Sequence, residues 1–309
     1  MTKVFIDGKA GTTGLRIYER LALRKDIELI TLSEELRKDT LARAEAINSA
    51  DIVFLCLPDA AAIEATALVE SRNTVIIDTS TAHRTSDGWS YGFPELSGQR
   101  EKIKSSKRIA NPGCHATGFV SLVAPLVERG ILPKDARLSC FSLTGYSGGG
   151  NKMIADYEND ELASELKAPR VYGLSQQHKH LPEMMKLCGL QSAPAFCPIV
   201  SSYYSGMEVT VPIFAKDING SIEDIKKLYA EYYSGRIVQY KENSDEGGFL
   251  SAEALSGRDD MQISVFGNEE RILLVSRFDN LGKGASGAAI QNMNILLGVD
   301  EATGLNIGG

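Results

Sequence analysis

The feature that most constrains this fold is the alternation of short apolar runs with helical stretches in the N-terminal part of the chain. The apolar runs that predict buried strands cover residues 3–6, 27–32, 51–58 and 74–78. Helical patterns follow two of them, at residues 15–21 and 60–70. Strands and helices that alternate in this way form a parallel, doubly wound sheet, which binds ligands at the carboxyl ends of its strands. The sequence therefore predicts a Rossmann-type α/β domain.

The first predicted strand runs into a glycine-rich turn and then directly into a helix. Gly8, Gly11 and Gly14 form this turn, with Thr12 and Thr13 between the last two glycines. Such a turn lets the backbone approach a pyrophosphate, whose charge then lies at the helix N-terminus. We predict a dinucleotide site here. The G-x-x-G-x-x-G spacing is less specific than G-x-G-x-x-G, so an ordinary glycine-rich turn is the alternative.

The second predicted strand ends at a residue that bears on cofactor choice. Ser33 stands where an NAD-selective site usually has a carboxylate for the ribose, and Arg37 and Lys38 follow shortly after. These residues suit a 2′-phosphate, which favours NADP over NAD. Glu34 and Glu35 weaken that argument, because a solvated run of charges is the alternative.

The strand pattern changes after residue 135. Strand-like runs cover residues 137–143, 207–214, 261–266 and 271–278, without the strand–helix–strand rhythm of the first part. We therefore expect an α+β second domain with a mixed or antiparallel sheet.

Cys114 is the strongest candidate for a reactive residue. The turn sequence Asn111–Gly113 precedes it, and apolar residues at 119, 122, 123, 126 and 127 predict a helix that begins beside it. Unpaired N–H groups and the helix dipole favour a thiolate at such a position. The alternative is a buried, inert cysteine.

Three further stretches carry possible chemistry. His178 and His180 supply a candidate base for Cys114, since a thiolate and its histidine are usually distant in sequence. Zinc binding by this pair lacks further ligands at a recognisable spacing. Arg84, beyond the end of a strand, is either an anion clamp or an ordinary surface arginine. Two glycine-rich stretches, residues 146–150 and 279–289, could approach a cofactor or merely form tight loops.

Composition excludes several other classes of function. The chain has 309 residues, a net charge of −7 and 43% hydrophobic residues, with scattered Lys and Arg, so nucleic acid is not an expected partner. No apolar run approaches the roughly 18 residues of a membrane span, and no signal-peptide pattern precedes the first strand. The five cysteines show no metal-type pairing, which favours reduced thiols in the cytoplasm.

Taken together, these motifs resemble those of the N-acetyl-γ-glutamyl-phosphate reductases of arginine biosynthesis, in their shorter form. The resemblance runs along the whole chain and rests on five motifs in order: Gly8 to Gly14, Asn111 to Cys114, Ser147 to Gly150, His178 to Glu183 and Asp279 to Gly284. One departure is His115, where these reductases commonly carry an aromatic residue such as tyrosine.

The resemblance implies a Rossmann domain of residues 1–112 with 287–309, and an inserted catalytic and oligomerisation domain of residues 113–286. It implies NADPH as cofactor, a small acyl phosphate as substrate, no metal, and a homo-oligomer (dimer or tetramer). It makes Cys114 the nucleophile and one of the paired histidines the acid/base, with His178 preferred over His180. The substrate-binding residues would be Arg84, Asn111, His180 and Glu183. The cofactor-binding residues would be Gly8, Gly11, Thr12, Thr13, Gly14, Ser33, Arg37, Ser147, Gly148, Gly149, Asn280, Lys283 and Gly284.

The implied reaction is reduction of N-acetyl-γ-glutamyl phosphate to N-acetylglutamate 5-semialdehyde and phosphate through a thioester on Cys114. The alternative within this class is an aspartate-semialdehyde dehydrogenase or another acyl-phosphate reductase. A dinucleotide-sensing regulator would not need the cysteine and the histidines. A cysteine hydrolase would not need the glycine turn.

Overall fold

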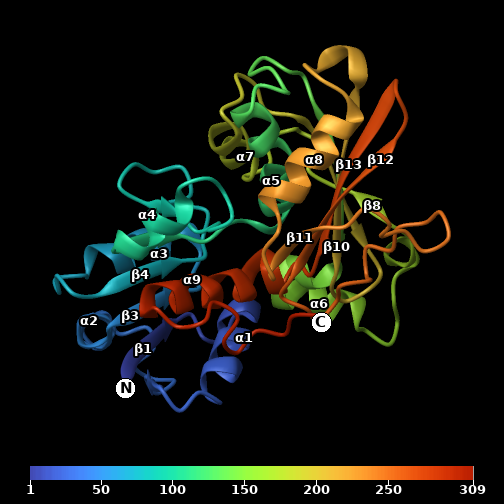
Figure 1. Cartoon of the computed structure of the whole chain (residues 1–309). Coiled ribbons are helices and arrows are strands. Elements are labelled where there is room, and N and C mark those ends of the chain that lie inside the picture. Colours follow the sequence, from blue (N-terminus) through green and yellow to red (C-terminus); the bar gives the residue numbers. More distant parts are fainter. Residues whose placement is uncertain (309) are drawn as a thin grey trace. The chain divides into compact units, whose positions relative to one another are not determined.

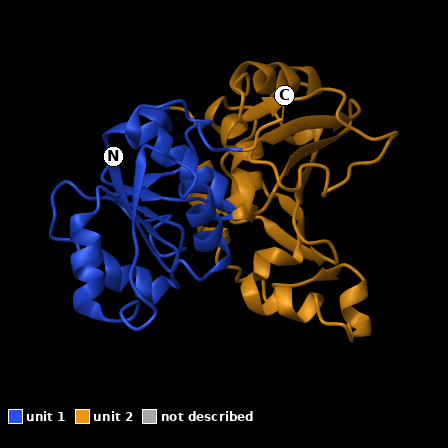
Figure 2. Ribbon diagram, turned by 90° about the horizontal axis from the view of Figure 1, so that it is seen from below, with its two compact units in different colours: residues 1–94, 98–113, 285–305 blue, residues 95–97, 114–284, 306–309 orange. Residues whose placement is uncertain are grey.

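A computed structural model describes residues 1–308, which form two compact units (Figures 1 and 2). The first unit comprises Met1–Pro94, Gly98–Gly113 and Ala285–Leu305. The second comprises Glu95–Ser97, Cys114–Gly284 and the residues from Asn306 onward.

The first unit contains a six-stranded sheet in the order β2-β1-β3-β4-β6-β5, and all its neighbouring strands are parallel. The strands are β1 (Thr2–Asp7), β2 (Ile27–Ile30), β3 (Ile52–Leu55), β4 (Val75–Asp78), β5 (Ser90–Tyr91) and β6 (Arg108–Ala110). The helices are α1 (Thr12–Leu21), α2 (Thr40–Ser49), α3 (Asp59–Ala67), α4 (Gln99–Ser105) and α9 (Gly287–Leu297). The predicted Rossmann-type fold is confirmed.

Helices cover both faces of this sheet because its core strands carry apolar side chains toward both faces. Successive side chains of a strand point to opposite faces. In β3, Ile52 and Phe54 pack in the core that contains residues of α1, α4 and α9, whereas Val53 and Leu55 pack against α2 and α3. Figure 1 shows α9, from the end of the chain, beside α1, from its start. The final helix therefore completes a core that the N-terminal residues begin.

The second unit contains a mixed seven-stranded sheet in the order β11-β12-β13-β10-β7-β9-β8. Its strands are β7 (Ser139–Gly145), β8 (Arg170–Val171), β9 (Ala195–Ser201), β10 (Met207–Phe214), β11 (Val238–Tyr240), β12 (Met261–Gly267) and β13 (Arg271–Phe278). Its α-helices are α5 (Cys114–Glu128), α6 (Gly150–Tyr157), α7 (Leu181–Cys188) and α8 (Ile222–Tyr232). The pairs β7–β9 and β11–β12 are parallel and the other pairs are antiparallel, as the predicted α+β domain requires.

Helix α5 is buried on nearly every side, and not only along the apolar stripe that the spacing predicted. A helix that is apolar all round belongs in a protein core. Pro125 lies inside α5 and has no N–H to donate to the carbonyl of Ser121. The hydroxyl of Tyr233 donates to that carbonyl instead, at 2.6 Å. The helix thus keeps its backbone groups satisfied despite the proline.

The boundaries between the units differ from the expected ones at the C-terminal end. We expected residues 287–309 to stay with the first domain, but the chain from Asn306 onward belongs to the second unit. The reason is a reciprocal pairing, since Asp259 N–H donates to the Asn306 carbonyl at 2.7 Å and Asn306 N–H donates to the Asp259 carboxylate at 2.8 Å. Gly282–Ser286 form a π-helical turn directly before α9.

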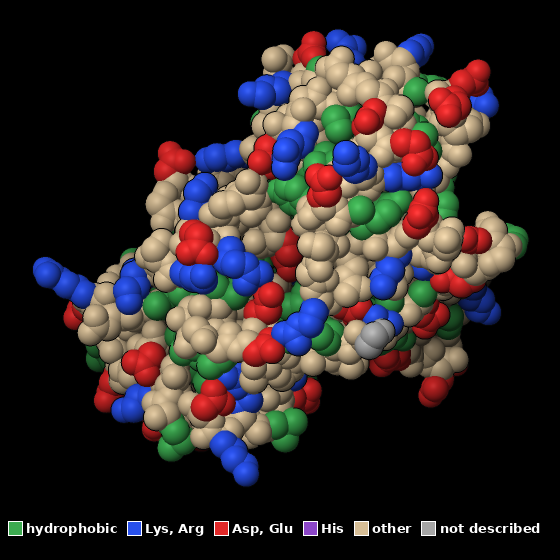
Figure 3. Space-filling view, viewed as in Figure 1, with side chains coloured by type: hydrophobic (Ala, Val, Ile, Leu, Met, Phe, Trp, Pro, Cys, Tyr) green, Lys and Arg blue, Asp and Glu red, His purple; other side chains and the backbone are tan. Residues whose placement is uncertain are grey.

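Among residues 1–308, no helix is long and apolar enough to cross a membrane. On the face drawn in Figure 3, Lys and Arg side chains are interspersed with Asp and Glu. That face shows no continuous positive stripe of the kind that follows a nucleic-acid backbone.

Candidate active site

The second unit places Cys114 at the first position of α5, as the turn chemistry predicted. The free N–H groups and the dipole of a helix N-terminus stabilise negative charge there. Cys114 is partly exposed, whereas Cys140 and Cys188 are buried. Burial raises the pKa of both of these thiols and raises that of Cys56 to about 12. These three cysteines are therefore poor nucleophiles at neutral pH.

Gly284 lies directly against Cys114. A Cβ atom at residue 284 would come within 3.0 Å of the Cys114 Cβ and 3.2 Å of the Asp279 carbonyl oxygen. A side chain at this position would press on Cys114, and a neighbouring atom would have to shift by a few tenths of an ångström to make room. Gly284 thus has a steric role beside the candidate nucleophile.

A cluster of aromatic rings accompanies the nucleophile in the same unit. His178 and His180 have ring centroids 4.8 Å apart, and each lies 5.5 Å from the ring of His115. The rings of Tyr172 and Phe196 pack against His178 at 6.0 Å and 5.1 Å. The predicted histidine pair therefore meets the residue that follows Cys114.

His178 is arranged as a neutral imidazole that can donate a proton. Burial, and then the positive charge of Lys179, lower the pKa of His178. Its Nδ1 accepts a hydrogen bond from the His180 backbone N–H at 3.2 Å. A neutral ring whose Nδ1 is an acceptor carries its proton on Nε2. His180 itself is the N-cap residue of α7 and is buried, as is Glu183 in the first turn of that helix.

The loop that carries His178 is held by a residue that the sequence analysis missed. The side-chain amide of Gln176 donates to the Phe196 carbonyl at 2.7 Å and accepts from the Phe196 N–H at 2.8 Å. Gln176 also has a φ of 55°, in the left-handed region that residues other than glycine rarely adopt. A strained residue held by two hydrogen bonds beside a candidate catalytic histidine is a common arrangement at functional sites.

His115, the departure from the family pattern, lies at the centre of the ring cluster. It is buried, and its Nδ1 lies 2.7 Å from the Ser142 hydroxyl and its Nε2 2.6 Å from the Tyr172 hydroxyl. Burial, and then the electrostatic interaction with the His178 ring, lower the pKa of His115 to about 3. Its neutral ring therefore links a residue of β7 to one that follows β8. Neither Tyr172 nor Ser142 stood in a motif that would have identified it.

The predicted substrate-phosphate residues of the first unit already have partners within that unit. Arg84 donates from Nε to the Asn111 carbonyl and from Nη2 to the Thr79 carbonyl, both at 2.9 Å. The Asn111 amide is buried and donates to the Ala285 carbonyl at 3.0 Å. These bonds fix the turn that precedes Cys114. Direct contact of either side chain with a substrate stays a prediction.

Several predicted cofactor residues of the second unit are pinned in its interior. Asn280 donates to the Ser147 hydroxyl at 3.0 Å and accepts from the Gly206 N–H at 2.9 Å. Gly148 and Gly149 follow Ser147 in a short 3₁₀ helix. Lys283 is almost fully buried, and its ammonium lies 2.8 Å from the carboxylate of Glu95. That partner was not among the predicted residues, because nothing local relates residues so distant in sequence.

In the first unit, the glycine turn has the tight geometry that a dinucleotide site needs. Gly8 has a φ of 89°, and a Cβ there would lie 2.2 Å from the Cys56 carbonyl oxygen. A Cβ on Gly14 would lie 2.5 Å from the Gly8 carbonyl oxygen. Gly11 is the N-cap residue of α1, so Thr12 and Thr13 begin the helix. The turn therefore presents the N-terminus of α1 without intervening side chains.

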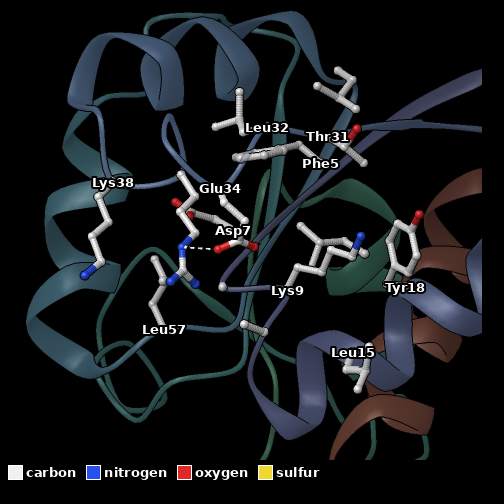
Figure 4. Close-up of a pocket in the computed structure, with 15 residues that line it drawn as sticks. Phe5, Asp7, Lys9, Leu15, Tyr18, Thr31, Leu32, Glu34, Lys38 and Leu57 are labelled. Carbon is white, nitrogen blue, oxygen red and sulfur yellow. Dashed lines mark ion pairs between the residues drawn. The ribbon is translucent and has the colours of Figure 1, made fainter.

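A cavity of about 330 Å³ lies beside this turn, and Figure 4 shows the side chains around it. Lys9, Tyr18, Thr31, Glu34 and Lys38 are among its lining residues. The Lys9 ammonium lies 3.3 Å from the centroid of the Tyr18 ring. The cavity thus joins the glycine turn to the end of β2, where the ribose of a dinucleotide is expected.

The cavity changes the expected basis of cofactor choice. Arg37 and Lys38 line it, as predicted, but Ser33 does not. The Ser33 hydroxyl lies 3.3 Å from the carboxylate of Glu35 instead. Arg37 forms an ion pair with Glu34 at 2.9 Å. Arginine and lysine, rather than the serine, are therefore the groups available to a ligand here.

Two protein-family models match successive parts of the chain. Residues 3–106 match the family model of the semialdehyde dehydrogenase NAD-binding domain, and residues 114–280 match that of the semialdehyde dehydrogenase dimerisation domain. These two models follow the division between the first and second sheets.

Similar sequences extend over nearly the whole chain. N-acetyl-gamma-glutamyl-phosphate reductase 2 of Nostoc sp. is 46% identical, over 98% of this chain and 99% of the relative. The corresponding reductase of Brucella ovis is 45% identical, over 96% of this chain and 99% of the relative. N-acetyl-gamma-glutamyl-phosphate reductase 2 of Pseudomonas putida is 44% identical, over 97% of this chain and 98% of the relative.

Solved structures share the fold at much lower identity. Aspartate semialdehyde dehydrogenase II of Vibrio cholerae has a TM-score of 0.72 at 15% identity, over 96% of this chain and 98% of that one. Aspartate semialdehyde dehydrogenase of Francisella tularensis has a TM-score of 0.71 at 16% identity, over 96% of this chain and 100% of that one. At such identities the likeness concerns the fold alone.

Proposed function

The chain belongs to the semialdehyde dehydrogenase family, and we propose that it reduces N-acetyl-γ-glutamyl phosphate to N-acetylglutamate 5-semialdehyde in arginine biosynthesis. The observation that carries this proposal is that Cys114 begins α5 and that His178 packs against the ring of His115, the next residue along the chain. Reductases named for this reaction are 44 to 46% identical over almost the whole chain. Their similarity supports the N-acetylglutamyl group as the acyl group of the substrate.

The first step uses the nucleophile and the helix N-terminus. The Cys114 thiolate attacks the acyl carbon, the carbonyl electrons move to oxygen, and their return expels phosphate. A thioester of Cys114 remains. The developing negative charge is stabilised by N–H groups at the start of α5, which need no reorientation during the reaction. Gly284 leaves room for the acyl group to approach the sulfur without displacing Cys114.

The second step returns the cysteine and releases the aldehyde. When bound, a reduced nicotinamide would supply the hydride that the thioester carbon accepts. The resulting thiohemiacetal collapses, so that its oxygen forms the aldehyde and the Cys114 thiolate leaves. His178 holds its proton on Nε2, where it can protonate the tetrahedral oxygen and take the proton back as the carbonyl reforms. His180 and Glu183, which begin α7 beside it, are proposed to contact the rest of the substrate.

The residues of the first unit fit NADP. The turn at Gly8, where a Cβ would collide with the backbone of Cys56, leaves the backbone open to a pyrophosphate, and the adjoining cavity would hold the adenosine half. Arg37 and Lys38 would bind the 2′-phosphate. The Arg37 guanidinium would leave the carboxylate of Glu34 and bind the doubly charged phosphate, which is the stronger partner. This combination supports NADPH over NADH as the donor.

A second copy of the chain is the proposed partner. Over much of β7 and β10 and at the start of β13, every second residue is exposed or partly exposed, and several of these residues are large and apolar. Phe141 on β7, Pro212 on β10 and Leu273 on β13 share this face, with Pro212 and Leu273 directly paired. Phe141 is 42% exposed and Leu273 is 41% exposed, although large contiguous apolar patches are uncommon on monomers. The matching family model describes this part of the chain as a dimerisation domain.

All five cysteines are free thiols, as suits an enzyme of the cytoplasm.

A phosphate-dependent assay in the reverse direction tests the proposal. N-acetylglutamate semialdehyde and aspartate semialdehyde are each offered with phosphate and NADP or NAD, and formation of the reduced cofactor is followed by absorbance. We expect turnover with N-acetylglutamate semialdehyde and its loss in Cys114→Ala, whereas Cys197→Ala, which alters another partly exposed cysteine, should stay active. Preference for aspartate semialdehyde, or substantial activity of Cys114→Ala, would refute the proposal.

A further inference from the structure

The chain of polar groups from Ser142 through His115 to Tyr172 has a definite direction. His115 uses both ring nitrogens, at 2.7 Å and 2.6 Å from the two hydroxyl groups. The buried ring stays neutral over the working pH range, because its pKa is lowered to about 3. A neutral imidazole has one N–H and one acceptor nitrogen. The three groups can therefore be hydrogen-bonded in only two orders, each of which leaves one hydroxyl hydrogen without a place inside the chain.

Burial decides between these two orders. If Tyr172 donated inward to His115, then Ser142 would accept from the ring, and its own hydrogen would need another acceptor. Ser142 is completely buried, so an unsatisfied hydroxyl hydrogen there would be costly. If Ser142 donates to Nδ1, then Nε2–H donates to the tyrosine oxygen, and the remaining hydrogen belongs to Tyr172, which is only partly buried. The second order leaves no buried donor unsatisfied.

The remaining hydrogen lies near the reacting centre. Tyr172 packs against the ring of His178 at 6.0 Å, and His115, which holds it, directly follows Cys114 in α5. After burial, the negative charge of Cys114 is the next cause that raises the pKa of Tyr172, so the hydroxyl keeps its proton at the pH of the reaction. A protonated hydroxyl beside a reacting sulfur can donate a hydrogen bond to an acyl oxygen carried by that sulfur.

We propose that Tyr172 is a catalytic hydrogen-bond donor to the oxyanion that forms when Cys114 attacks an acyl carbon, and that His115 and Ser142 are positioning residues that turn its hydroxyl outward. This deepens the proposed function and rests on it for the identity of the acyl group. In the attack the sulfur forms a bond to carbon, the carbonyl π electrons move to oxygen, and the Tyr172 O–H donates to that oxygen. No proton needs to transfer, and the same contact serves again when hydride addition recreates the oxyanion.

The test uses two small reagents that differ in whether an oxyanion forms. p-Nitrophenyl acetate acylates a thiolate through a tetrahedral oxyanion and releases p-nitrophenolate, whereas iodoacetamide alkylates it by direct displacement of iodide. Both rates are measured on the whole purified enzyme over a range of pH, and mass spectrometry identifies Cys114 as the modified residue. Neither reagent requires the proposed substrate, so failure of this inference is distinguishable from failure of the proposed function.

Tyr172→Phe keeps the ring and removes only the hydroxyl. We expect acylation to slow by about 100-fold, the effect typical of one lost oxyanion donor, and alkylation and its pH profile to stay within about twofold of wild type. The kcat for the acyl phosphate should fall in parallel with little change in KM. Tyr232→Phe is the matched control, because its hydroxyl bonds elsewhere in the same unit, to Glu128 and the Ser97 N–H. It should leave both rates unchanged.

Ser142→Ala tests the direction of the chain independently. Without the serine hydroxyl, Nδ1 of His115 has no partner in either order, so the preference that holds the Tyr172 hydroxyl outward is lost and acylation should slow selectively. The double variant Tyr172→Phe/Ser142→Ala should be no slower than Tyr172→Phe alone, because both changes remove the same hydrogen bond. The inference is overturned if Tyr172→Phe slows acylation and alkylation equally or leaves acylation unchanged, or if the effects of the two substitutions multiply.

Discussion

Gln176→Ala isolates the clamp on the loop that carries His178. The variant loses two hydrogen bonds to the backbone of buried Phe196, at 2.7 and 2.8 Å. Each is worth roughly 0.5 to 1.5 kcal/mol, and alanine keeps the cost of a left-handed φ of 55°, so nothing offsets the loss. We expect the free energy of unfolding to fall by about 2 kcal/mol. For a unit of this size, that lowers Tm by about 4 to 8 °C.

The same substitution should affect the rate more than the fold. A misplacement of about 1 Å can cost on the order of 100-fold in a catalysed step. We therefore expect kcat to fall by at least about tenfold with KM for the cofactor unchanged. Gln177→Ala is the matched control, since it removes the neighbouring, exposed glutamine side chain. The measurements are thermal unfolding and steady-state turnover of both variants. Equal Tm and equal turnover in the two would refute the idea that the clamp positions the histidine.

Four further outcomes follow from the site and its surroundings. His178→Asn should lower kcat by about 10²- to 10⁴-fold with cofactor affinity little changed, as steady-state kinetics would show, whereas a change only in KM would assign the acid/base role elsewhere. Arg37→Ala should weaken NADP and leave NAD almost untouched; an unchanged ratio of kcat/KM for the two cofactors would move the 2′-phosphate to Lys38. Leu273→Asp should convert the proposed oligomer to monomers in sedimentation velocity, and an unchanged sedimentation coefficient would exclude this face. Between about pH 6.5 and pH 3, His115 binds a proton in the unfolded chain but not in the folded one. The free energy of unfolding should therefore fall by about 1.4 kcal/mol for each pH unit of acidification in this window. His115→Phe should flatten this slope in denaturant titrations.

The sequence predicted those parts of the fold that local pattern determines. The core strands of the first sheet are centred on short apolar runs, of which β3 is apolar throughout, and strands β10 and β13 have the predicted bounds. Cys114 was placed at a helix start because the turn chemistry and the apolar spacing agree within a few residues. In these cases, one short segment contains all the information needed.

The parts that were missed depend on contacts between distant segments. The two-residue strand β8 has no pattern of its own, and only its pairing with β9 brings Tyr172 towards His115. The buried ion pair of Lys283 with Glu95 joins residues from opposite ends of the second unit's sequence, whereas its role at the cofactor stays a prediction. The contact of Ser33 with a cofactor also stays a prediction, because a loop beyond a strand can turn a side chain either way. Single-sequence reasoning has no measure of such orientation.

The nucleophile and the proposed acid/base stand on supports of different stiffness, which bears on how the site tolerates change. Cys114 begins a helix that is enclosed by the core and braced at Pro125 by Tyr233, so its position can move only if the core moves. His178 lies on a loop whose geometry depends on one strained glutamine and two hydrogen bonds. Substitutions around α5 should therefore appear first as lost stability, and those around residues 173–178 as lost rate in a folded enzyme. A helix supplies the fixed point that covalent attack requires, and a locally held loop can adjust as the acyl group changes from acyl phosphate to thioester to aldehyde.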